Sequence, residues 1–178
     1  WISKNYERAV LANHTSKNIL VPSSFHQEQH KEYLFELMYG KQQDDLYVKD
    51  MVIQQSLVNH YAVNGALAVV LNQHFTKGQW WHVQSLLLTQ NASQEAKVTA
   101  TIWFNELHLS IEKDGNWLLL QTYLYHTPED VLYYILNAMQ QLGLSPDETP
   151  VLLQGMVDQK SALYDVLYGY IVNLQLNN

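Results

Sequence analysis

The sequence contains no cysteine. This absence excludes disulfide bonds, zinc sites built on thiolates and enzymes that use a cysteine nucleophile. A chain without disulfides is typical of a reducing compartment, so we expect a cytoplasmic protein. The sequence also begins at Trp1 without an initiator methionine or an apolar leader, and we interpret it as part of a longer chain.

Glycine, proline and long hydrophobic runs are also scarce. Seven glycines and four prolines among 178 residues are too few for a collagen-like or low-complexity chain. No run of about 18 apolar residues is present, which excludes a membrane-spanning helix. With 47% hydrophobic and 15% charged residues, the sequence predicts a folded protein of one or two small domains.

Positive charge is scarce in the second half of the chain. Residues 1–90 hold seven basic and seven acidic side chains, whereas residues 91–178 hold three and ten. The net charge of −7 therefore lies entirely in the second half. Because an acidic surface repels phosphate backbones, we do not expect a nucleic-acid partner.

Hydrophobic periodicity predicts alternating strands and helices in the first half. Ser24 and Gln27 have the spacing of a capping box, so a helix should cover residues 25–39, and Gly40 should end it. The other expected elements are strands at 19–21, 56–63 and 80–83, helices at 64–75 and, capped by Ser85, at 86–91, and a loop at 41–50.

The second half shows a clearer alternation of apolar and polar residues. Residues 98–104, 107–112 and 117–125 read as three antiparallel strands, with Asp114 and Gly115 as a hairpin turn. The remaining expected elements are a helix capped by Thr127 and ended by Gly143, a strand at 151–153, a helix at 160–168 and a strand at 171–176. Strands joined through helices run parallel, so the order β-β-β-α-β-α-β predicts a mixed sheet covered by helices.

Four segments carry a resemblance to a known family. They read ILVPSSF at 19–25, LVNHYAV at 57–63, YHTPEDVLYY at 125–134 and PVLLQG at 150–155. Together they resemble an uncharacterised bacterial family, a domain of unknown function with an actin-like ATPase fold. The resemblance implies an α/β chain of the ribonuclease-H-like class, with mixed sheets flanked by helices and two half-domains. The first lobe would cover residues 1–95, without its opening strands, and the second lobe residues 96–178.

The resemblance also implies where a nucleotide would bind. Actin-like ATPases hold phosphates with glycine-containing hairpins and adenosine with a Gly-Gly turn. In this sequence the second-lobe hairpin falls at Asn105 and Glu106, which lack glycine and add negative charge. The adenosine turn falls at Gln154 and Gly155, which keep one glycine of two. We therefore expect a degenerate site at which ATP is not favoured, and no cofactor; the first-lobe hairpin would lie before Trp1.

His26 and His30 have the spacing of two metal ligands on one helix face. Zinc proteases with this spacing need a glutamate directly after the first histidine, and the chain has Gln27 there. We therefore interpret both histidines as solvent-exposed and expect no metal site. The sequence also has no nucleophile elbow, phosphate loop or dinucleotide fingerprint, so we assign no catalytic residue.

Aromatic side chains are the candidates for contact with a protein partner or a second copy of the chain. In the helix that follows Thr127, Tyr133 and Tyr134 flank the expected core stripe and leave almost no polar face. Trp80 and Trp81 should point to opposite sides of their strand, and the outward ring would mark a contact patch. The expected core stripe of the helix is Leu132, Ile135, Met139 and Leu142.

Two functions remain open from the sequence. The first is a noncatalytic actin-like scaffold, an assembly or adaptor protein, motivated by a well-patterned core without phosphate chemistry. The alternative is an ATP-binding phosphotransferase or ATPase whose phosphate loop lies upstream of Trp1.

Overall fold

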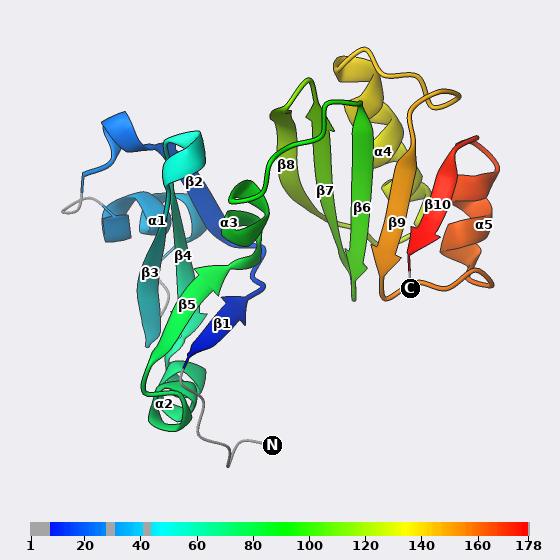
Figure 1. Cartoon of the computed structure of the whole chain (residues 1–178). Helices are drawn as coiled ribbons and strands as arrows, with labels where there is room; N and C mark the ends of the chain where they lie inside the picture. Colours follow the sequence, from blue (N-terminus) through cyan, green and yellow to red (C-terminus); the bar gives the residue numbers. More distant parts are fainter. Residues whose placement is uncertain (1–7, 28–30, 41–43, 178) are drawn as a thin grey trace. The chain divides into compact units, whose positions relative to one another are not determined.

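The computed structural model describes residues 8–27, 31–40 and 44–177. The chain divides into two compact units, Trp1–Gln90 and Asn91–Asn178, whose elements are labelled in Figure 1. Each unit is described by itself. No helix in the described ranges is long and apolar enough to cross a membrane.

The first unit contains two small sheets. Strands β2 (Asn18–Pro22), β4 (Leu57–Asn64) and β3 (Asp45–Val52) form an antiparallel sheet in that order. Strand β1 (Ala9–Asn13) pairs in parallel with β5 (Gly78–His82). The helices are α1 (Lys31–Tyr39), α2 (Gly65–His74) and α3 (Val83–Leu88), with short 3-10 helices η1 (Ser23–Phe25) and η3 (Ile53–Gln55).

Several elements of this unit follow from local sequence signals. The strands expected at 19–21, 56–63 and 80–83 are present as β2, β4 and β5. Asn64 caps α2 by accepting the backbone N–H of Leu67 at 3.1 Å. Gly40 follows α1 with φ +74°, the left-handed conformation that glycine adopts at a helix C-terminus.

The helix expected to start at Phe25 is wrong at its beginning. Ser23–Phe25 form η1, α1 is described from Lys31, and residues 28–30 lie outside the described part of the chain. The backbone N–H and the hydroxyl of Ser23 both donate to the carbonyl oxygen of Ser56, at 2.8 and 3.0 Å. This attachment to the start of β4 overrides the capping preference that the sequence showed at Ser24.

The loop expected at 41–50 is also wrong from Asp45 onward, because β3 begins there; residues 41–43 lie outside the described ranges. The charged residues Lys49 and Asp50 are typical of a loop, so the sequence did not predict a strand there. Asp50 is only 4% exposed and accepts hydrogen bonds inside the unit, so its charge is compatible with a buried strand position.

The helix expected at 86–91 starts earlier, as α3. Its N-cap is His82, whose Nδ1 accepts the backbone N–H of Gln84 at 3.2 Å. Ser85, the expected cap, lies fully buried inside the helix. The capping role therefore passes to an imidazole, which the usual N-cap preferences do not anticipate.

The second unit is built on a five-stranded mixed sheet. Its strand order is β10-β9-β6-β7-β8, in which β6, β7 and β8 are antiparallel neighbours, and β9 runs parallel to both β6 and β10. This mixed sheet with its helices confirms the fold class expected from the sequence. The elements are β6 (Lys97–Trp103), β7 (Glu106–Lys113), β8 (Asn116–Leu124), α4 (Pro128–Gln141), β9 (Val151–Gly155), α5 (Ala162–Tyr168) and β10 (Leu174–Asn177).

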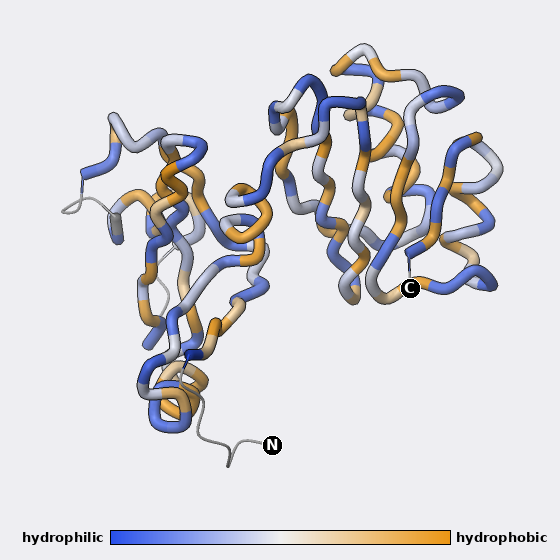
Figure 2. The backbone as a smooth tube through the Cα atoms, in the orientation of Figure 1, coloured by the Kyte–Doolittle hydropathy of each residue, from blue (hydrophilic) through white to orange (hydrophobic). Residues whose placement is uncertain are grey.

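One face of this sheet forms the core of the second unit. Alternate residues of β6, β7 and β9 pack there against both α4 and α5, and the alternation along the strands can be followed in Figure 2. The core stripe of α4 differs from the expected one, because Val131 and Ala138 are buried whereas Leu132 and Leu142 are only partly buried. The fully buried side chains include Val98, Ile102, Leu107, Leu109, Ile111, Ile135, Met139, Leu153 and Leu167.

The start of α4 is fixed by a capping box, as the sequence predicts. The Thr127 hydroxyl accepts the backbone N–H of Asp130 at 3.3 Å, and the Asp130 carboxylate accepts the N–H groups of Thr127 and His126 at 3.0 and 2.9 Å. These backbone donors hold the pKa of Asp130 below its ordinary value. The last strand begins later than expected, at Leu174, and Ile171 is instead buried in the connection after α5.

Candidate functional site

The four residues expected at a nucleotide site lie together at one end of the second unit's sheet. Asn105 lies in the turn after β6, and β7 begins at the next residue, Glu106. Ile102, near the end of β6, pairs in register with Gly155 at the end of β9, and Gln154 precedes Gly155. Because β6 and β9 are parallel, their carboxyl ends bring these positions to one edge of the sheet.

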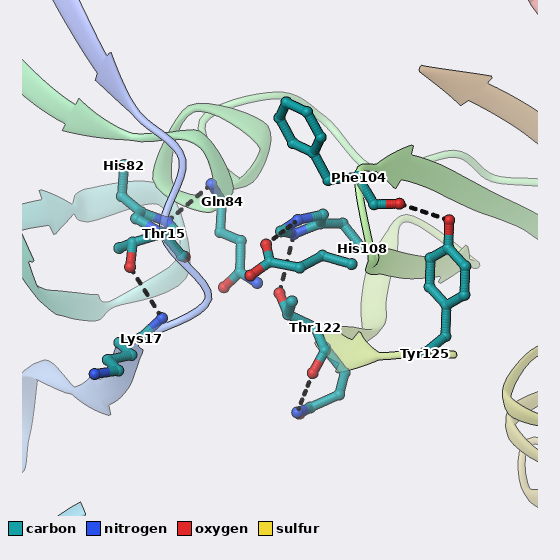
Figure 3. Close-up of polar contacts among 10 residues, drawn as sticks. Thr15, Lys17, His82, Gln84, Phe104, His108, Thr122 and Tyr125 are labelled. Carbon is teal, nitrogen blue, oxygen red and sulfur yellow. Dashed lines mark hydrogen bonds and ion pairs between the residues drawn. The ribbon is translucent and has the colours of Figure 1, made fainter. Parts of the chain in front are cut away.

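The turn between β6 and β7 carries aromatic rings. Trp103 and Phe104 are 43% and 67% exposed, and their ring centres lie 5.5 Å apart in an edge-to-face arrangement. Phe104 has φ +52°, a conformation uncommon for a residue with a side chain. The Tyr125 hydroxyl donates to the Phe104 carbonyl oxygen at 2.7 Å, as Figure 3 shows, and the Tyr125 N–H donates to the carbonyl of Asn105 at 3.0 Å. Tyr125 therefore holds a turn that displays two rings.

A row of polar side chains crosses the sheet face opposite the core. Gln154, Thr101, His108 and Thr122 are register neighbours on β9, β6, β7 and β8. The Gln154 side-chain amide donates to the Thr101 hydroxyl oxygen at 2.9 Å. His108 Nδ1 lies 3.0 Å from the Thr122 hydroxyl oxygen, a contact visible in Figure 3, and His108 Nε2 lies 3.2 Å from the carboxylate of Glu106.

This row fixes the orientation of the His108 ring and the position of the Glu106 carboxylate. The Glu106 carboxylate contacts Nε2 of His108, and the Thr122 hydroxyl contacts Nδ1 of the same ring. Both nitrogens of His108 are thus engaged within the sheet. The carboxylate of Glu106 is consequently held at the same end of the sheet as the aromatic turn.

Gly155 has a packing reason to be glycine. Its φ is +92°, and a Cβ added there would lie 2.3 Å from the carbonyl oxygen of Ile102. The next residue, Met156, donates its N–H to that same oxygen at 2.8 Å. Glycine is therefore required here for the close approach of β9 to β6, independently of any nucleotide.

The two tyrosines of α4 have different surroundings. Tyr134 is half-buried and stacks on Tyr123 of β8, with ring centres 4.4 Å apart and an interplanar angle of 12°. Tyr133 is 63% exposed and touches Tyr134 at an edge, with ring centres 5.6 Å apart. Burial raises the pKa of Tyr123. Of the two candidates for partner contact, only Tyr133 presents most of its ring to solvent.

Trp80 and Trp81 of β5 are both half-buried. Trp80 packs against the apolar cluster of the first unit, which contains Tyr61, Val63 and Ala68. Its indole N–H donates to the side-chain oxygen of Asn72 at 3.1 Å. Both rings of the tryptophan pair are therefore only partly accessible to a partner.

The first unit contains a buried carboxylate that the sequence did not single out. Asp50 accepts the Tyr61 hydroxyl at 2.9 Å and the backbone N–H of His82 at 2.7 Å, and Ser85 is a third hydrogen-bond partner. Burial raises the pKa of Asp50, although these hydrogen bonds act in the opposite direction. Burial and the nearby charge of Asp50 raise the pKa of Tyr61.

A network of side chains extends from this carboxylate. Asn59 donates to the Ser85 hydroxyl at 2.9 Å and accepts from Asn18 at 3.0 Å, and Asn18 also donates to the Gln84 side-chain oxygen at 2.8 Å. His82 and Gln84, labelled in Figure 3, belong to the same network. The network ties β2, β3, β4 and α3 together, so its role is to hold the unit rather than to face a substrate.

His26 does not take the place expected for it. It follows η1 instead of lying in a helix, it is half-buried rather than solvent-exposed, and His30 lies outside the described residues. His26 meets His60 of β4, which is 3% exposed: His26 Nδ1 and His60 Nε2 are 3.2 Å apart. Among the described residues, His26 therefore contacts a histidine on a strand that lies far away in the sequence.

The sequence reasoning missed two groups of residues for different reasons. Trp103 and Phe104 had a visible signal, since two aromatic residues directly precede the expected turn at Asn105. The pairing of His26 with His60 had none, because it joins segments 34 residues apart whose contact depends on the sheet.

Comparison with known proteins agrees with the sheet topology. The profile of a family described as "Protein of unknown function (DUF3822)" matches residues 1–174. A solved structure from Bacteroides thetaiotaomicron, described as a protein with actin-like ATPase fold and unknown function, is similar with a TM-score of 0.83 and 18% identity, over 99% of this chain and 71% of that chain. No curated protein matches. The structural similarity confirms an actin-like ATPase fold, and the chain belongs to the DUF3822 family of proteins of unknown function.

Proposed function

We propose that this chain is a noncatalytic actin-like protein that acts as a scaffold or adaptor in a protein assembly. The observation that carries the proposal is the β6–β7 turn, where the exposed rings of Trp103 and Phe104 precede Glu106 by three and two residues. A phosphate loop needs successive backbone N–H groups aimed at an anion. This turn offers apolar surface and a carboxylate in their place.

The charge of Glu106 opposes a phosphate at this position. Two negative charges about 5 Å apart repel by about 3 kcal/mol at an effective dielectric constant of about 20. A triphosphate seated on the turn would meet this repulsion without the glycine backbone that normally offsets it. The glycine that remains at the adenosine position, Gly155, is accounted for by its contact with Ile102.

An apolar surface at the same end of the sheet supports a protein partner. We call it the aromatic tip and define it as Trp103, Phe104, Leu124 and Met156, which are 43%, 67%, 58% and 52% exposed. Leu124 pairs in register with Glu106, and Met156 follows Gly155. Aromatic residues and methionine are enriched in protein interfaces. Tyr133, Tyr134, Trp80 and Trp81 remain further candidates for such contacts.

The proposal assigns residues 1–95 to an incomplete first lobe and residues 96–178 to a second lobe, in a cytoplasmic protein. The alternative is an ATP-binding phosphotransferase or ATPase whose phosphate loop precedes Trp1. The fold of the Bacteroides protein supports this alternative, because its description refers to an actin-like ATPase fold.

The decisive experiment is a calorimetric titration of the full-length protein with ATP and Mg²⁺. We expect no saturable binding at micromolar ATP, and the same absence with a non-hydrolysable analogue. Titration with Mg²⁺ alone is the control for metal-only heats. Saturable ATP binding, followed by release of phosphate, would contradict the noncatalytic proposal and establish the alternative.

A further inference from the structure

The five-stranded sheet of the second unit ends in a long strand with one open side. Strand β8 pairs with β7, and within the described ranges no strand pairs with its other side, as Figure 1 shows. With nine residues, β8 is the longest strand in these ranges. An edge of this length presents a row of backbone N–H and C=O groups to which another strand can bind.

The direction of the backbone groups in β8 follows from the turn beside it. The N–H of Tyr125 donates to the carbonyl of Asn105, so Tyr125 points towards the β7 side. Alternate residues of an antiparallel strand point to opposite neighbours, so the even-numbered positions in 120–124 point away from β7. The exposed side chain of Gln121 donates to the carbonyl of Thr122 on this outer side, at 3.2 Å. An added strand would exchange this side-chain bond for backbone hydrogen bonds.

The other edge strands of the two larger sheets are protected against such pairing. Strand β3 contains three charged residues, β2 has five residues and ends at Pro22, and β10 has only four residues. Charge, proline and short length are the usual means by which proteins prevent edge-to-edge pairing. Residues 116–125 contain no charged residue, proline or glycine. Of these edges, β8 is therefore the one best suited to accept a strand.

We propose that two copies of this chain associate through β8, with the two strands antiparallel about a two-fold axis, so that both sheets join into one. The edge offers no charged side chain with which to select a basic or acidic partner. It suits an equally uncharged strand, and β8 itself is one. In a pair of β8 strands no like charges face each other in any register, and four leucines among the nine residues supply apolar contacts.

The regular part of β8 sets the position of the axis and the strength of the contact. The register with β7 shifts between Ile111 and Glu112, which leaves β8 regular from Leu119 to Leu124. The axis would therefore lie near Gln121, in the middle of this segment. One strand pair is a smaller contact than the about 1,200 Å² of stable interfaces, so we expect a dissociation constant of about 10 to 100 μM.

The test is sedimentation equilibrium of the full chain at low and high salt. We expect a monomer–dimer equilibrium that is tighter at high salt, which screens the repulsion between two chains of net charge −7. Gln121→Lys brings two ammonium groups together near the axis, and dimerisation should weaken at least about tenfold. Val172→Lys makes the same change of charge at an exposed position next to β10, at the opposite edge of the sheet, and should dimerise like wild type.

Spin labels give a second readout that reports the contact itself. Because the chain has no cysteine, one introduced thiol carries the label at a single position. Labels on Gln121→Cys should show strong dipolar broadening in the dimer, since positions near the axis lie within about 10 Å of each other. Labels on Val172→Cys should show none, because ten strands at a spacing of about 4.8 Å separate them by about 40 Å.

Three results would overturn the proposal. The first is a wild-type chain that stays monomeric up to about 500 μM, well above the expected dissociation constant. The second is a dimer that Gln121→Lys and Val172→Lys weaken equally. The third is a dimer without broadening from labels at position 121, because the two copies would then meet at another surface.

Discussion

Replacing Gly155 with alanine tests whether the packing of β9 against β6 requires glycine at this position. Among the described residues, Gly155 is the only glycine at the end of the second unit's sheet that carries the aromatic tip. The new Cβ would lie 2.3 Å from the carbonyl oxygen of Ile102 and 3.1 Å from its nitrogen. An ordinary contact is about 3.5 Å or longer, so β6 and β9 must separate by about 1 Å. The movement weakens the hydrogen bond from Met156 N–H to the same oxygen, now 2.8 Å long.

The expected loss follows from these two effects. Alanine at the observed φ of +92° costs about 1 to 2 kcal/mol, because its Cβ crowds the backbone. Separation of the strands and loss of one hydrogen bond add about 1 to 2 kcal/mol. We therefore expect Gly155→Ala to lower the free energy of unfolding by about 3 kcal/mol, measured by urea titration followed by circular dichroism.

Gly143→Ala is the matched control. Gly143 also has a positive φ, +65°, but a Cβ there would meet nothing within 4 Å. Its replacement should cost about 1 kcal/mol from the backbone alone. If both variants lose the same free energy within about 0.5 kcal/mol, the close approach of β9 to β6 does not explain the glycine, and the packing argument fails.

Three further predictions concern the pKa shifts and the packing. Burial raises the pKa of Asp50 above its ordinary value of 3.8 in the folded protein, so the free energy of unfolding falls as pH rises from 3.8 towards the raised pKa. Asp50→Asn should remove this dependence in urea titrations repeated at increasing pH. A steeper dependence in the variant would contradict the reasoning. Thr127→Ala should cost about 1 kcal/mol through loss of the α4 cap, and an unchanged urea midpoint would refute the capping role. Tyr134→Ala should lower the thermal midpoint markedly because its stacking on Tyr123 is lost, whereas Tyr133→Ala should leave it nearly unchanged; equal shifts would argue against that packing.

The second unit was the more predictable from sequence because its signals are local. The turn at Asp114 and Gly115 has φ values of +53° and +72°, which these residue types tolerate. The capping box of α4 joins residues three positions apart. Each signal acts within a few residues, so the sequence alone contains the information needed to place it.

The first unit was less predictable because its charged strand depends on distant partners. Asp50 is stabilised by Tyr61 and His82, which lie 11 and 32 residues away. Ser23 likewise bonds to Ser56, 33 residues away, and thereby replaces the expected helix start. No local window includes both members of these pairs.

The candidate site also has parts that the local sequence predicts and parts that depend on the register of distant strands. The turn at Asn105 was placed from alternation, and the rings before it were visible in the sequence. The row through His108 and Thr122 required the register of three strands, which periodicity alone does not fix. The geometry of His26 and His60 depends on the sheet that carries His60.

The strand order of the second unit affects how the chain behaves during synthesis. Strands β6, β7 and β8 can pair as soon as they leave the ribosome. The other neighbour of β6 is β9, and Val98 cannot pair with Val151 until that residue, 53 positions later, has been synthesised. At translation rates of about 5 to 20 residues per second, this interval lasts about 3 to 11 s. Throughout it, the nascent chain exposes an unpaired strand edge that can recruit other chains. Until the crossover through α4 is complete, this edge of β6 is therefore where association with other chains is expected.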